Sequence, residues 1–323
     1  MNKPSALLCC CWPHWQQPRR PLLALALASR LTSALALALT LTLFPGGHAT
    51  AQGTPVPTPD MPSLLQAMGS KPVLLLGEQH DADVHQQLQR EVLATLLQIP
   101  APSGSGSRRV AALVLEMAAR GTSTANLPPD TQEDKVRAAL QWDEAGWPWA
   151  RYGPLVMQAV RAGLPVLGGN LPASEMRSAM AQAPLDTLLP ASAMEQHRTN
   201  IREGHCNLLP EAHIPAMVRI QVARDVALAQ TVQDALQPGK VVVLVGGNEH
   251  MRPDVGVPQH LAQRGVAWPD QVLVVHMRAD AAPAAGVLGS LAAAATPPGV
   301  LTWTTPPLPP KDYCAELREQ FRR

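Results

Sequence analysis

The chain of 323 residues is poor in aromatic residues, which make up 3% of it, and it contains two tyrosines, Tyr152 and Tyr313. It also lacks an extended basic run. The 26 Lys and Arg residues face 25 Asp and Glu residues. Four of the basic residues and none of the acidic ones lie before residue 52, so the remainder carries 22 basic and 25 acidic residues. Such a chain has no electrostatic means of holding a phosphate backbone, which argues against nucleic-acid binding.

Cysteines are also few. Three of the five, at positions 9–11, precede the longest apolar run, whereas a lipobox cysteine must follow such a run. A lipid anchor is therefore not expected. The other two, Cys206 and Cys314, are able to form a disulfide in an oxidising compartment, and two buried free thiols are the alternative.

The first 51 residues have the pattern of a signal peptide. A basic segment without acidic residues precedes the apolar run Leu31 to Phe44, and small residues follow at 49–51. We predict cleavage after Ala51 and export to the periplasm or cell envelope. The alternative is an uncleaved N-terminal anchor, because residues 22–44 are long enough to span a bilayer.

The pattern after the leader predicts a proline-rich flexible tether over 52–62 and one α/β domain over 63–323. Short apolar runs alternate with helical periodicity, which is typical of a mainly parallel central sheet flanked by helices. A largely helical insertion is expected around 172–238, and 281–300 is expected to be a flexible loop. The predicted strands are 72–76, 110–115, 165–167, 241–245 and 272–275, and the main predicted helices are 81–97, 154–162, 214–236 and 311–321.

Polar residues directly follow the predicted strands. Glu78 and His80 follow the first strand, Glu116 ends the second, and His250 follows the fourth. Since the carboxyl ends of parallel strands meet at one edge, these residues are expected to lie together. Imidazole with carboxylate favours iron, manganese or zinc over calcium. The sequence thus predicts a metal site of Glu78, His80, Glu116 and His250, whereas the alternative is that each residue caps its own loop.

Five segments carry a family resemblance: VLLLGEQHDADVHQQLQREVL, ALVLEM, WPWARYGPLVMQAVRAGLPVLGGNLP, ARDVALAQTV and GGNEHMRPDVGVPQHL. In this order they resemble the ChaN-like haem-iron-binding proteins, within a superfamily that includes Tiki, TraB and erythromycin-esterase-like proteins, over residues 64–276. The resemblance implies an α/β domain that binds haem or haem iron for iron uptake, with an outer-membrane haem-uptake system as a partner and a homodimer as an assembly. Many family members are lipoproteins, and this chain departs from them in lacking a lipobox.

Haem needs an axial ligand and apolar walls. Tyr152, near several tryptophans, is the predicted ligand, with His85 as an alternative and Arg252 as the partner of a propionate. The other interpretation of the tryptophans and Tyr152 is a packed aromatic corner. In the longest predicted helix, Arg224 and Asp225 are interpreted as an ion pair.

The second functional hypothesis is a metal-dependent hydrolase. A divalent metal such as Mn, Zn or Fe at the strand ends would lower the pKa of a bound water, and Glu78 or Glu116 would act as the base. A serine hydrolase is disfavoured because no Gly-x-Ser-x-Gly segment is present.

Overall fold

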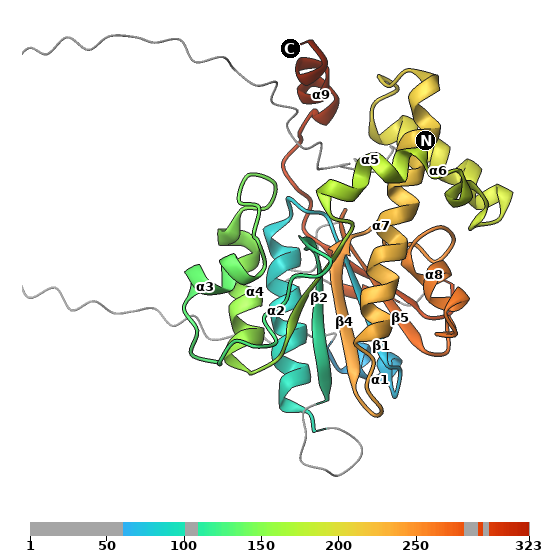
Figure 1. The fold of residues 1–323 in the computed structure, drawn as a ribbon. Helices are drawn as coiled ribbons and strands as arrows, with labels where there is room; N and C mark the ends of the chain where they lie inside the picture. Colours follow the sequence, from blue (N-terminus) through green and yellow to red (C-terminus); the bar gives the residue numbers. More distant parts are fainter. Residues whose placement is uncertain (1–60, 101–108, 281–289, 293–296, 323) are drawn as a thin grey trace, which may run out of the picture.

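The computed structural model describes residues 61–100, 109–280, 290–292 and 297–322. Their strands form one seven-stranded sheet in the order β3-β2-β4-β1-β5-β7-β6 (Figure 1). Six of these strands run parallel, and β6 pairs antiparallel with β7 at one edge. The strands are β1 Val73–Glu78, β2 Val110–Ala119, β3 Val166–Asn170, β4 Val241–Gly247, β5 Val272–Ala279, β6 Ser290–Ala292 and β7 Val300–Thr305.

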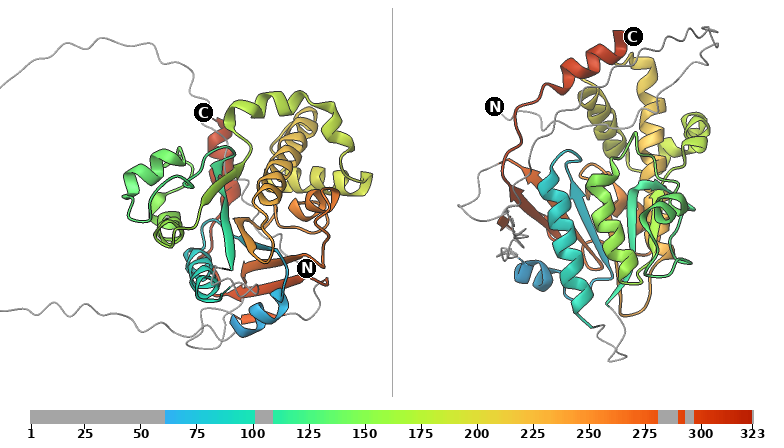
Figure 2. Two further views of the ribbon diagram at one scale, coloured as in Figure 1. Left: turned by 60° about the horizontal axis from the view of Figure 1, so that its bottom comes forward. Right: turned by 90° about the vertical axis from the view of Figure 1, so that its left-hand side faces the viewer.

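Helices cover both faces of the sheet (Figures 1 and 2). Alternate residues of β1 pack on opposite sides: Leu74 and Leu76 pack in the core formed with α1, α2 and α4, and Val73 and Leu75 in the core formed with α7 and α8. Burial on both faces explains the unbroken apolar run of this strand. The helices are α1 Met61–Met68, α2 Asp83–Gln98, α3 Glu133–Ala139, α4 Trp149–Arg161, α5 Ala173–Ala181, α6 Ala191–Gly204, α7 Ile214–Asp234, α8 Val257–Gln263 and α9 Tyr313–Arg322, with 3-10 turns η1 Ala183–Thr187 and η2 Glu211–His213.

A helical cap formed by α5, α6 and the first half of α7 stands beyond the carboxyl ends of the strands (Figure 1). It has its own apolar cluster, in which Leu171, Met194 and Ile201 pack with Ile214 and Val218 of α7. The helical insertion predicted around 172–238 contains this cap, whereas its end, the second half of α7, packs on the sheet through Leu228 and Val232. Among the described helices, none combines the length and the apolar character that crossing a membrane requires.

The predicted α/β class is confirmed, and each of the five predicted strands is present. Strand β7 at 300–305 was not predicted, because the flanking glycine and prolines of 297–299 and 306–307 favoured a loop. The described part of the predicted loop 281–300 includes the short strand β6, and the rest of 281–296 lies outside the described residues. The predicted signal peptide and the tether up to residue 60 also lie outside them, and α1 begins at Met61.

Cys206 and Cys314 form a disulfide, with their Cα atoms 5.7 Å apart and a sequence separation of 108. The bond joins α9 to the segment that follows α6. None of the side chains of α9 is buried, so packing holds this helix weakly. The Tyr313 phenol adds a hydrogen bond to the Asp81 carboxylate, near the end of β1.

We predict that Cys206→Ser combined with Cys314→Ser lowers the free energy of unfolding by about 2–4 kcal/mol, because the bond no longer restricts the unfolded chain. Urea unfolding measures the loss. Reductant should destabilise the wild-type protein by a similar amount and leave the double variant unchanged. Equal stability of the two proteins without reductant would contradict this role of the disulfide.

Candidate functional site at the carboxyl edge of the sheet

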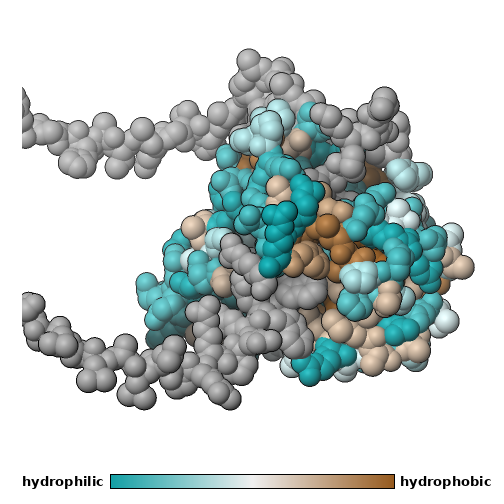
Figure 3. Space-filling model, turned by 90° about the horizontal axis from the view of Figure 1, so that it is seen from above, coloured by the Kyte–Doolittle hydropathy of each residue, from teal (hydrophilic) through white to brown (hydrophobic). Residues whose placement is uncertain are grey.

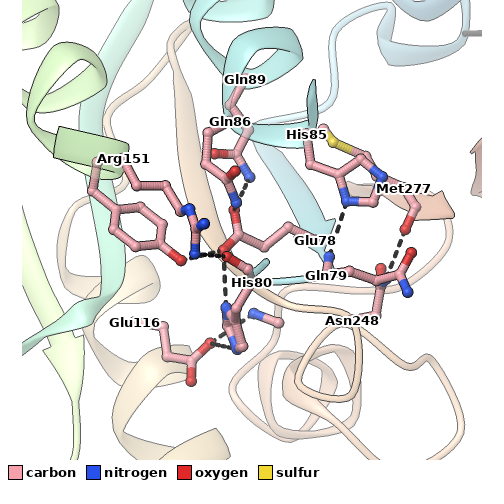
Figure 4. A network of polar contacts seen from close by, with 12 residues as sticks. Glu78, Gln79, His80, His85, Gln86, Gln89, Glu116, Arg151, Asn248 and Met277 are labelled. Carbon is pink, nitrogen blue, oxygen red and sulfur yellow. Dashed lines mark hydrogen bonds and ion pairs between the residues drawn. The ribbon is translucent and has the colours of Figure 1, made fainter. Parts of the chain in front are cut away.

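The four residues predicted from the strand ends lie together at the carboxyl edge. Figure 4 shows Glu78, His80 and Glu116 facing one another. His80 Nδ1 is 2.9 Å from Glu78 Oε1, and His250 Nε2 is 3.2 Å from Glu116 Oε1. His80 Nε2 lies 3.9 Å from Glu116 Oε2, beyond hydrogen-bond distance. The parallel register that places Glu78 beside Gly247 of β4 brings these segments to one level.

The Glu78 carboxylate is buried and fully engaged. Besides His80, it accepts the Tyr152 hydroxyl at 2.8 Å on Oε1, and Gln86 and Gln89 donate to Oε2 at 2.9 and 2.6 Å. The two glutamines lie three residues apart on the first turns of α2, so they face the end of β1 together. Sequence reasoning missed them, although this spacing directly after Glu78 and His80 was the available signal.

Glu116 is the centre of the second half of the network. The backbone N–H of Gly247 donates to its Oε2 at 2.6 Å, while His250 contacts Oε1. The other ring nitrogen of His250, Nδ1, lies 2.5 Å from Oδ1 of the buried Asp225 on α7. The predicted ion pair between Arg224 and Asp225 is therefore absent, because Asp225 instead faces His250. No pattern in the sequence indicates the contact between Asp225 and His250.

Charge accounts for the pKa shifts in this network. Burial lowers the pKa of His250, but the carboxylates of Glu116 and Asp225 raise it to about 10. Burial raises the pKa of Glu116, and the two imidazoles outweigh this and hold it far below its usual range. Burial likewise lowers the pKa of His80, while Glu116 and the hydrogen bond to Glu78 raise it above its usual value. The two histidines thus act as counter-ions for buried carboxylates.

The two glycines that end β4 lie where neighbouring side chains leave no room for a Cβ atom. A Cβ atom on Gly247 would lie 2.8 Å from His80 Nε2, and one on Gly246 would lie 2.8 Å from Glu116 Oε2. Any side chain at either position would displace the network. The glycines therefore serve the site as well as the turn.

Tyr152 belongs to a packed aromatic corner. Its ring lies edge-on to Trp147 at 5.8 Å, and Trp147 in turn lies edge-on to the His80 ring at 4.9 Å. Tyr152 is 1% exposed. Its burial, and to a lesser extent the neighbouring Glu78 carboxylate, raise the pKa of its phenol well above the usual value. These features favour the packing interpretation, and haem ligation by Tyr152 stays a prediction.

His85 and Arg252, the other predicted haem contacts, are also engaged within the protein. His85 is buried: its Nδ1 accepts the Gln79 backbone N–H at 3.0 Å, and its Nε2 lies 2.9 Å from Thr305 Oγ1. Burial lowers the pKa of His85 to about 4, so the ring is neutral at pH 7. Arg252 pairs with Asp254 in the same loop.

The side chains of this network are not arranged as a set of metal ligands. In the described part of the chain, no three His, Cys, Asp or Glu side chains form a ready-made metal-binding group. The Glu78 carboxylate accepts hydrogen bonds from glutamines of α2 and from Tyr152. The Glu116 carboxylate contacts the Gly247 backbone N–H and His250. The predicted ligands are brought together as ion pairs and hydrogen bonds, and a metal among them stays a prediction.

Tyr152→Phe should lower the free energy of unfolding by about 1–2 kcal/mol, since the buried Glu78 carboxylate loses a donor. Denaturant unfolding measures this change. The absorption spectrum of added ferric haem should stay as in the wild-type protein. Loss of a tyrosinate charge-transfer band with unchanged stability would instead identify Tyr152 as the haem ligand.

Stability should also depend on the neutral state of His85. Its pKa in the folded protein is below its unfolded value of about 6.5, so its contribution is complete above pH 6.5 and is lost as the pH falls toward about 4. The free energy of unfolding of His85→Gln should therefore fall less steeply over this interval. His213→Gln, at an exposed position, is the matched control and should keep the wild-type slope. Equal slopes for all three proteins would count against this assignment.

Comparisons with known proteins agree with the fold described above. Residues 64–261 match the family model described as haem-binding uptake, Tiki superfamily, ChaN. No curated protein matches the sequence significantly. Among solved structures, a ChaN of Campylobacter jejuni, described as binding haem cofacially, has a TM-score of 0.56 at 22% identity, covering 75% of this chain and 90% of its own.

A second solved structure, of a succinoglycan biosynthesis protein, has a TM-score of 0.41 at 13% identity and covers 69% of each chain. The Campylobacter structure establishes a shared fold. The family model spans more than half of the 323 residues, including all four strand-end residues of the site. The chain belongs to the ChaN family of haem-binding uptake proteins in the Tiki superfamily.

Proposed function

We propose that this chain is an exported protein that binds haem or haem iron and takes part in iron uptake. The match of residues 64–261 to the haem-binding uptake family carries this proposal. The disulfide between Cys206 and Cys314 supports export, because such bonds persist in oxidising compartments such as the periplasm. A homodimer and an outer-membrane haem-uptake system as partner are proposed from the family resemblance.

Among the residues at the carboxyl edge, His80 has the features of a haem iron ligand. Its side chain is 12% exposed, its Nδ1 is bound to Glu78, and its Nε2 has no partner within hydrogen-bond distance among the described residues. A carboxylate on one ring nitrogen fixes the orientation of the imidazole and makes the other nitrogen a better ligand. Arg151 holds the loop by donating to the His80 backbone carbonyl at 2.8 Å. We therefore propose His80 as the axial ligand, and because Glu116 and Glu78 raise the pKa of its ring, iron binding would displace the proton from Nε2.

An apolar patch lies at the same end of the molecule. Seen from the carboxyl ends of the strands, it is bordered in part by hydrophilic residues (Figure 3), and we propose that it contacts the porphyrin. Within the site, the edge of Trp147 packs against the His80 ring. When bound, haem would supply its iron, and the protein would supply an imidazole, apolar contacts and exclusion of water.

One observation favours a metal-dependent hydrolase as a second candidate. The Nε2 atoms of both His80 and His250 face Glu116, and their Nδ1 atoms are bound to Glu78 and Asp225. Carboxylate-bound histidines are typical around metal ions. Mn, Zn or Fe would be held by His80, His250 and Glu116. Glu78 is poorly suited as a base because four donors already occupy its oxygens.

Titration with haemin tests the primary proposal. The wild-type protein should shift the Soret band at a fixed stoichiometry. We expect His80→Ala to weaken binding about tenfold or more, because the proposed axial ligand is lost. The variant should also melt at a lower temperature than the wild-type protein, because the buried Glu78 carboxylate loses a donor, so both affinities are measured well below the two melting temperatures. The exposed His213→Ala is the control. Unchanged haemin affinity in His80→Ala would exclude this ligand.

Binding measurements on the double variant His80→Ala/His250→Ala show whether the two histidines serve one shared site or two independent sites. If both side chains serve one ligand, the double variant should lose less binding free energy than the sum of the single losses. The same proteins titrated with Mn²⁺ and Zn²⁺ distinguish the two candidates. Tight metal binding together with no Soret shift would favour the hydrolase.

A further inference from the structure

Arg224 on α7 is a buried cation without a carboxylate partner. The residue is 6% exposed, and its Nε has no hydrogen-bond partner. Its Nη2 contacts the Met176 sulfur of α5 at 3.8 Å, which is a weak acceptor. No ion pair includes Arg224 within the described part of the chain. Because a guanidinium stays charged even when buried, this charge requires an explanation.

Other arginines of the chain show what the guanidinium edge formed by Nε and Nη2 normally binds. Arg219 donates from Nε and Nη2 to the two oxygens of Asp186 at 2.9 and 2.6 Å. Arg202 uses the same two nitrogens toward Glu211, each at 3.0 Å to a different oxygen. In each case one edge of the guanidinium holds a carboxylate with two parallel hydrogen bonds. In Arg224 this edge faces a thioether.

Arg224 lies beside the functional site. The next residue, Asp225, holds His250, and Gln221, one turn earlier on α7, also lies 3.1 Å from His250 Nδ1. Successive residues of a helix point about 100° apart, and accordingly Asp225 contacts His250 in the segment after β4 while Arg224 contacts Met176 of α5. Helix α5 itself follows β3, whose last residue, Asn170, donates to the Glu116 backbone carbonyl at 2.9 Å.

We infer that Arg224 is a subsite for a carboxylate of the ligand, which takes the position now held by the Met176 sulfur. Met176 is partly exposed, and its unbranched side chain has three rotatable bonds, so it is able to move aside. This inference rests on the proposed function, in which the carboxylate is a haem propionate. Arg252, the propionate partner predicted from the sequence, already holds Asp254 through the same edge.

Haemin and haemin dimethyl ester, in which both propionates are esterified, test the subsite in the full chain. Arg224→Met should bind haemin about tenfold or more weakly than the wild-type protein and should bind the ester with wild-type affinity. Arg161→Met, at an exposed position on α4, is the control and should change neither affinity. Without ligand, Arg224→Met should melt at or above the wild-type temperature, because it removes an unpaired buried charge.

Two results would overturn the inference: unchanged haemin affinity in Arg224→Met, or equal losses for haemin and the ester, which would indicate a structural role. If the wild-type protein binds neither compound, the proposed function fails, and succinate then tests the subsite alone. A rise in melting temperature with succinate in the wild-type protein but not in Arg224→Met would support a carboxylate subsite. The absence of such a rise would overturn it.

Discussion

The buried Glu116 carboxylate is the charge on which the carboxyl edge depends. A carboxylate removed from water is costly unless charges and hydrogen bonds replace its solvation. Here the replacements come from two other strands: Gly247 and His250 from the end of β4, and His80 from the loop after β1. Burial of one charge therefore fixes the relative positions of three strand ends, and Asp225 extends this control to α7.

The two halves of the network differ in how completely their polar atoms are used. Around Glu78, four donors fill the oxygens, and nothing there invites a further ligand. By contrast, His80 Nε2 lies 3.9 Å from Glu116 Oε2, and the Nε–Nη2 edge of Arg224 faces the Met176 sulfur. In the proposed function, the first would be a nitrogen ligand for iron and the second would bind a carboxylate of the same ligand. The contacts of Glu78 with His80 thus orient the imidazole.

Much of this arrangement could be predicted from the sequence, because it follows from local patterns. Strands buried on both faces appear as unbroken apolar runs, and parallel order places their last residues together, which is why Glu78, His80, Glu116 and His250 were found. The partners were harder to predict. Asp225 and the glutamines of α2 contact the site through helix rotation and packing, which periodicity alone does not fix. Tyr152 was chosen as an iron ligand for its chemistry, whereas its burial against Glu78 emerges only from the fold.

The disulfide has a consequence for the order of assembly. Between Cys206 and Cys314 the chain forms α7, α8 and the strands β4, β5, β6 and β7, so β4 and β5, which flank β1 in the sheet, lie inside the covalent loop. Parallel strands pair through long-range contacts, which form slowly. The native bond therefore closes a covalent loop around a slowly pairing part of the sheet. Oxidation of these two cysteines before the strands pair would restrict how the enclosed segments reach their neighbours.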